Sequence, residues 1–196
     1  MADDPTKILM PVFSRWWNAI TDARNQGRNA DRAALAQLRR LKLNDFGEGP
    51  RPDVALAMTL DAFRDLYLKV SRAGARLPPD WESDLVVAAV TLAHVRSDAP
   101  GQSTAGMLGG RDADQRKMKE ARFLRLMRVS TAADLFNQTR RLTALADGKA
   151  PVGDLGASLL FWRSQPNVRR DWARAYYGLD RPSSEYPDQP AAPAGA

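Results

Sequence analysis

The sequence predicts an all-α protein made of two small helical bundles, a glycine-rich linker between them and a disordered C-terminal tail. Three observations support this fold class. Apolar residues recur every three or four positions along most of the 196-residue chain, as they do on one face of a helix. Prolines and glycines stand at the ends of these periodic segments. No segment alternates polar and apolar residues with period two, so we expect no sheet of any size.

The first half of the chain has four periodic segments. They lie within residues 8–20, 35–41, 56–70 and 81–95. Turn residues flank them, namely Asp-Pro at 4–5, Pro50 and Pro52, Gly74, and Pro-Pro-Asp at 78–80. Proline fits the first turn of a helix and glycine fits its C-terminal end. We therefore expect residues 1–97 to form an N-terminal helical bundle.

The second half begins with a change in composition. Residues 98–111 are small, polar and rich in glycine, which is typical of a linker. Helices are then expected near 112–128, 131–146, 152–163 and 167–177, which together form a C-terminal basic bundle over residues 112–178. Thr131 and Asp134 have capping-box spacing, Pro166 suits a first helical turn, and Gly178 suits a helix stop. Residues 179–196, rich in Pro, Ser, Ala and Gly, are expected to be disordered.

Basic charge is concentrated in the same half. The formal net charge is +6, to which residues 111–178 contribute +7, residues 1–110 contribute +1 and residues 179–196 contribute −2. Seven basic residues fall between positions 111 and 128: Arg111, Arg116, Lys117, Lys119, Arg122, Arg125 and Arg128. The last three recur every third residue, so on a helix they lie on one side. Such a surface attracts nucleic acid by neutralising phosphates, although a solvated helix face in an arginine-rich protein has the same pattern.

Residues for catalysis or metal binding are scarce. The chain has no cysteine, which excludes disulfides, thiolate metal sites and cysteine nucleophiles. His94 is the sole histidine, and its neighbours Leu92 and Val95 favour a structural role. The glycine-rich segment 106–111 lacks the Lys-Ser/Thr ending of a phosphate-binding loop. We expect no enzyme activity, no cofactor and no metal site.

We expect no signal peptide and no membrane-spanning segment. The acidic start of the sequence, MADDPTK, differs from a signal peptide, and no stretch approaches the ~20 apolar residues of a membrane span. A cytoplasmic protein without a membrane partner is expected.

Residues 121–146 contain a basic helix of the form R-x-x-R/Q-x-x-R, a short turn, and a helix ending in Arg140-Arg141-Leu142. This segment resembles the CasB family, the small subunit of Cascade, the type I-E CRISPR effector complex of antiviral defence. Trp16-Trp17, Leu38-Arg-Arg-Leu41 and residues 159–178 match the family in order and spacing. The resemblance covers most of residues 8–178, and the tail lies outside it.

The resemblance implies an all-helical, non-catalytic subunit that is present in two copies beside the backbone and large subunits of Cascade. It implies a role in bracing the guide RNA–target DNA hybrid and in holding the displaced single strand of the R-loop. The candidate nucleic-acid-binding residues are Arg39, Arg40, Arg51, Lys119, Arg122, Arg125, Arg128, Arg140 and Arg141. Arg169-Arg170 are weaker candidates that could instead face a neighbouring subunit. The alternative is a helical adaptor that binds only protein, its arginine face meeting acidic partner surfaces.

Overall fold

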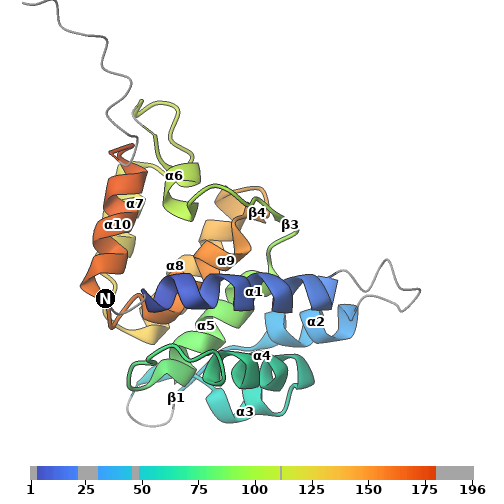
Figure 1. Ribbon diagram of the computed structural model, residues 1–196. Coiled ribbons are helices and arrows are strands. Elements are labelled where there is room, and N and C mark those ends of the chain that lie inside the picture. The colour runs from blue at the N-terminus through green and yellow to red at the C-terminus, as the bar shows by residue number, and fades with distance from the viewer. Residues whose placement is uncertain (1–3, 22–30, 46–48, 111, 180–196) are drawn as a thin grey trace, which may run out of the picture.

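The computed structural model describes residues 4–21, 31–45, 49–110 and 112–179 (Figure 1). Helices dominate these ranges, which confirms the all-α class. They are α1 (Pro5–Thr21), α2 (Arg32–Arg40), α3 (Val54–Met58), α4 (Asp61–Ser71), α5 (Trp81–Ala93), α6 (Thr104–Leu108), α7 (Glu120–Met127), α8 (Ala132–Leu145), α9 (Val152–Phe161) and α10 (Pro166–Tyr176). None of them is both long and apolar enough to cross a membrane.

Two short strand pairs join the helices. Strand β1 (Leu43–Asp45) pairs antiparallel with β2 (Pro50–Pro52). Strand β3 (Ser97–Asp98) pairs parallel with β4 (Lys149–Ala150), with Ser97 opposite Lys149. The second pair ties the end of α5 to the turn between α8 and α9.

Helix α5 is the centre of the fold. Every residue from Ser83 to Ala93 is buried, because α5 has packed neighbours on several sides. Helix α8 and helix α9 both pack against it, and α1 lies across α9 (Figure 1). A helix that is apolar all round is expected only in such a position.

Glycine allows α1 and α9 to approach closely. A Cβ atom on Gly156 would lie 2.5 Å from Cγ of Phe13, and a Cβ atom on Gly153 would lie 2.7 Å from the carbonyl oxygen of Met10. Only a residue without a side chain fits at these two positions. Helix α1 is further fixed by Trp17, whose Nε1 donates to the carbonyl oxygen of Leu92 at 3.1 Å.

The predicted bounds of two helices were wrong. The segment 56–70 is divided into α3 and α4, because Leu60 adopts an extended conformation at the start of α4. Leu56, which contributed to the apolar period, is 48% exposed, so the period does not mark the core there. The helix expected from 112 begins only at Glu120.

The segment before α7 bonds to other parts of the fold. The backbone N–H of Met118 donates to the carbonyl oxygen of Leu108 at 2.9 Å, and the Tyr176 hydroxyl donates to the carbonyl oxygen of Met118 at 2.7 Å. These contacts satisfy backbone groups that a longer helix would pair internally.

The predicted division into two bundles stays a prediction. Helix α9 packs against both α1 and α5, so helices from the two halves of the sequence share contacts. The predicted linker contains α6, whose Thr104 N–H donates to Oδ2 of Asp154 at 2.7 Å. The predicted disordered tail lies outside the described residues from position 180 onward.

Candidate nucleic-acid interface

Helix α7 exposes its arginines because its apolar side is held in the core. Phe123 and Leu126 are buried, and the Phe123 ring stacks on the Tyr176 ring of α10 with centroids 3.7 Å apart. Arg122 and Arg125 each directly precede one of these buried residues in the sequence and are exposed. The helix therefore has the basic face that the sequence predicted.

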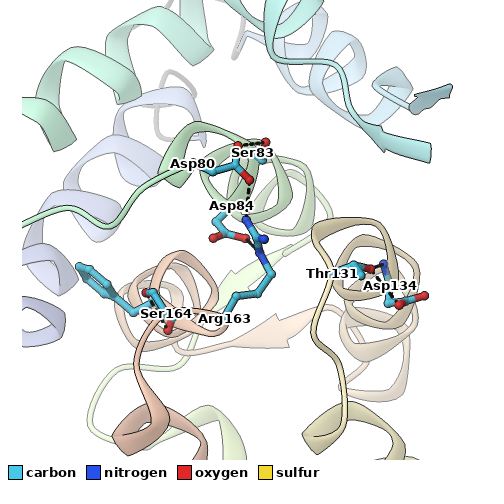
Figure 2. A network of polar contacts seen from close by, with 8 residues as sticks. Asp80, Ser83, Asp84, Thr131, Asp134, Arg163 and Ser164 are labelled. Carbon is cyan, nitrogen blue, oxygen red and sulfur yellow. Dashed lines mark hydrogen bonds and ion pairs between the residues drawn. The ribbon is translucent and has the colours of Figure 1, made fainter. Parts of the chain in front are cut away.

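Helix α8 is fixed at its start by the predicted cap. The Asp134 N–H donates to Oγ1 of Thr131 at 3.1 Å, and the Thr131 hydroxyl donates to the Asp134 carboxylate (Figure 2). Farther along, buried Thr91 of α5 donates its hydroxyl to Oγ1 of buried Thr139 at 3.0 Å. This contact joins the buried faces of α5 and α8.

The end of α8 has a basic surface. Arg140 and Arg141 are exposed, whereas Leu142 is buried. The Arg140 guanidinium lies 5.7 Å from the centre of the Phe136 ring, in the range of a cation–π contact. Arg140 is thus partly held in place on its own helix.

A groove of about 570 Å³ lies between α7 and α8, and we call it the α7–α8 groove. Its lining includes four of the predicted site residues: Arg122, Arg125, Arg140 and Arg141. None of the four forms an ion pair with a carboxylate in the parts of the chain that the structure describes. Four like charges around one hollow create a positive potential that favours an anionic ligand.

Two predicted residues lie at the ends of α7, outside this lining. Lys119 is the N-cap residue of α7 and Arg128 is its C-cap residue, and both are exposed. They extend the basic surface along the helix without entering the groove.

The remaining three predicted residues lie on elements packed against α5. Arg39 and Arg40 end α2, and the Arg39 Nε–H donates to the carbonyl oxygen of Ala93 at 2.7 Å. Arg51 is exposed on β2, which packs against α8 and α5. The structure therefore places these residues on elements next to α5, and the lining of the α7–α8 groove includes none of them.

Two residues that the site prediction omitted lie in or beside this groove. Gln138 is half-buried in the groove lining, and its spacing from Arg141 on α8 could have identified it. Arg96 lies in an adjoining hollow with Arg140. No local sequence pattern could have identified Arg96, because the fold alone brings it to α8.

Arg116 belongs to the basic sequence run but has a packing role. Its Nε–H donates to the carbonyl oxygen of Gly110 at 2.8 Å, and its guanidinium lies 5.2 Å from the centres of both the Tyr176 and Tyr177 rings. Of the other arginines considered from the sequence, Arg169 bonds to the carbonyl oxygen of Met127 at 3.5 Å, and Arg111 lies outside the described residues.

Arg163, which follows α9, is paired with two carboxylates (Figure 2). Its guanidinium lies 2.7 Å from Oδ1 of Asp84 and 2.9 Å from Oδ2 of Asp80, and we call these three residues the Arg163 cluster. Burial raises the pKa of Asp84 to about 6, outweighing the opposing effect of Arg163. Burial opposes the charge of Arg163, but hydrogen bonds and attraction to Asp84 and Asp80 raise its pKa overall.

His94 is half-buried near the end of α5. Its Nδ1 lies 2.8 Å from the carbonyl oxygen of Val90, consistent with the structural role expected from the sequence. Across the described residues, no three histidine or acidic side chains are grouped so that they could hold a metal ion.

Comparison with known protein families gives a match to the family described as CRISPR-associated protein Cse2, over residues 34–177. The matched range begins in α2, ends at the C-cap of α10 and includes the α7–α8 groove. Comparison with curated proteins gives no match, and comparison with solved structures gives none.

Proposed function

The chain belongs to the CRISPR-associated Cse2 family, also called CasB, and is a subunit of a CRISPR Cascade complex; from this premise we propose that it stabilises the R-loop. It is the non-catalytic small subunit, assembled in the cytoplasm with the backbone and large subunits and a second copy of itself. It braces the guide RNA–target DNA hybrid and holds the displaced strand in the α7–α8 groove.

The observation that carries this proposal is the groove with four arginines that have no carboxylate partner within the described residues. Arginine forks bind phosphate oxygens and can also stack on bases. Contacts to phosphates carry no sequence information by themselves. This suits a complex in which base pairing with the guide reads the sequence, because the displaced strand can then have any sequence.

The test is charge reversal in the groove of a reconstituted complex. The triple variant Arg122→Glu, Arg125→Glu, Arg141→Glu is compared with the control triple Arg32→Glu, Arg76→Glu, Arg174→Glu. The control arginines are exposed, and none lines the groove. Both variants change the net charge equally, so a difference between them reports the location of the charge.

We expect the groove variant to assemble on guide RNA and to bind duplex target at least about tenfold more weakly than the control, since three attractive contacts become repulsive. Binding to a complementary single strand should change by less than about twofold, because no strand is displaced there. Equal losses on both targets would place these arginines against the hybrid. Loss of the subunit from the purified complex would favour the protein-only adaptor.

A further inference from the structure

A second hollow of about 350 Å³ adjoins the α7–α8 groove. The two share Arg140 and Ala144, so the surface is continuous from one to the other. The far side of the second hollow is formed by His94 and Arg96 after α5 and by Asp147 after α8. Its volume lies in the range of clefts that hold small ligands, about 300 to 1,000 Å³.

Arg96 is held against the turn that follows α8. Its backbone N–H donates to the carbonyl oxygen of Gly148 at 2.7 Å. A Cβ atom on Gly148 would lie 2.9 Å from Cγ of Arg96, so the arginine stem lies directly on the glycine backbone. Gly148 has φ +72°, which glycine adopts without strain. A stem fixed in this way loses less side-chain entropy when its guanidinium binds a ligand.

The second hollow has an excess of positive charge. Arg96 and Arg140 face a single carboxylate, that of exposed Asp147. Arg96 forms no ion pair with Asp147 or with any other carboxylate of the described residues. Arg96 is exposed, so its charge is accessible to a ligand that arrives along the groove.

We propose that the strand held in the α7–α8 groove continues past Arg140 into the second hollow, where Arg96 binds a further phosphate. This inference rests on the proposed function, because it extends the path of the same displaced strand. The ligand is a single strand of nucleic acid contacted through its backbone, and the contact has no base preference.

The first test is Arg96→Gln in the reconstituted complex, with Arg76→Gln as the exposed control. Binding to duplex target is measured across a salt series. Loss of one phosphate contact reduces the slope of log affinity against log salt by about 0.7. We expect that reduction and a several-fold loss of affinity at low salt for Arg96→Gln, with neither change for the control.

The second test moves Arg96 without altering any charge. In Gly148→Ala the new Cβ displaces the Arg96 stem, and this variant should weaken duplex binding as Arg96→Gln does. The double variant should bind duplex target no more weakly than Arg96→Gln alone, because the two changes remove the same phosphate contact. If Gly148→Ala does not fold, the Arg96→Gln salt series decides alone.

A cross-link identifies the strand. The chain has no cysteine, so Ala144→Cys creates a single thiol on the surface shared by the two hollows. DNA that carries an activated mixed disulfide on a backbone tether should be attacked by this thiol when the tether is on the displaced strand, so that a protein–DNA disulfide forms and the small thiol leaves. Cross-linking only to the target strand would overturn the inference.

The outcomes separate this inference from the proposed function. A defect in the Arg122, Arg125, Arg141 variant together with wild-type behaviour of Arg96→Gln would overturn the extended path and leave the groove proposal in place. Equal losses of duplex and single-strand binding in Arg96→Gln would overturn the inference by placing Arg96 at the hybrid. Wild-type behaviour of both variants would overturn both.

Discussion

The Arg163 cluster and the α7–α8 groove are both built on arginine, yet their electrostatics differ. In the cluster, Asp84 and Asp80 lie within 3 Å of the guanidinium. In the groove, four arginines have no carboxylate partner in the described part of the chain. The role of an arginine therefore depends on which groups the fold places opposite it.

Solvent exposure gives the two regions different energetics. The Asp84 side chain is 2% exposed and that of Arg163 is 21% exposed, so removing one partner leaves the other poorly solvated. The groove arginines are exposed, and exposed charges contribute little to stability. We therefore expect substitutions in the cluster to affect folding and substitutions in the groove to affect binding.

The largest effect on stability is expected for Arg163→Met. This change leaves the buried Asp84 carboxylate without its cation, and it should lower the free energy of unfolding by about 3 kcal/mol at pH 7. Urea denaturation followed by circular dichroism measures the difference, with Arg174→Met as the exposed control. If Arg163→Met lowered the free energy of unfolding by less than about 1 kcal/mol, the Arg163 cluster would contribute no more to stability than exposed charges do.

The pH dependence of Asp84 tests the same contrast. Its pKa is raised by burial to about 6 in the folded chain, so the folded state binds the proton more tightly than the unfolded state. The stability that this group contributes is complete below about pH 4 and is lost as the pH rises through 6. Between pH 4 and pH 7 the wild type should lose about 2 kcal/mol relative to Asp84→Asn.

Denaturation curves of both proteins over that pH range provide the measurement. A wild type that gains stability relative to Asp84→Asn as the pH rises would show that attraction to Arg163 outweighs burial.

A smaller effect is expected when the groove charges are neutralised. The triple variant Arg122→Gln, Arg125→Gln, Arg141→Gln should change the free energy of unfolding by less than about 1 kcal/mol, with a small gain because like charges are removed. Arg116→Gln is the matched control from the same basic run. It should lose about 1 kcal/mol, because Arg116 bonds to Gly110 and lies over two tyrosine rings. Equal changes in the free energy of unfolding of the two variants would contradict the different roles assigned to Arg116 and to the groove arginines.

The smallest effect is expected for His94→Gln. The ring is already bonded to the Val90 carbonyl oxygen, and the charge of the second hollow comes from Arg96 and Arg140. Binding of the reconstituted complex to duplex target should stay within about twofold of wild type. A normally folded variant that lost target binding would assign His94 a direct role.

The parts of the fold that follow from local sequence were predicted well. Helical periodicity gave the α-class, and the Thr131–Asp134 spacing gave a cap that the structure confirms. The exposure of Arg122 and Arg125 on α7 also follows from the helical spacing of the buried apolar residues around them. These features depend on residues a few positions apart, whose relative placement the helix geometry fixes.

The secondary-structure prediction was wrong where contacts with distant segments override the local preference for a helix. The basic run from 112 was expected to be helical, but Met118 bonds to Leu108 and Tyr176 instead. Arg116 consequently has a different role from Arg122, although both belong to one run of basic residues. Local propensity is a weak prior that such tertiary contacts override.

Local patterns in the sequence are enough to show that this chain is helical, basic in its second half and similar to CasB. They do not show which arginines are neutralised and which share a groove, because these properties depend on contacts between distant segments. Arg163 pairs with Asp84, which lies 79 positions away in the sequence. Arg96 and Arg140 line the same hollow only because α8 packs against α5. Charges interact through space, and the field at a residue depends on which segments the folded core brings near it.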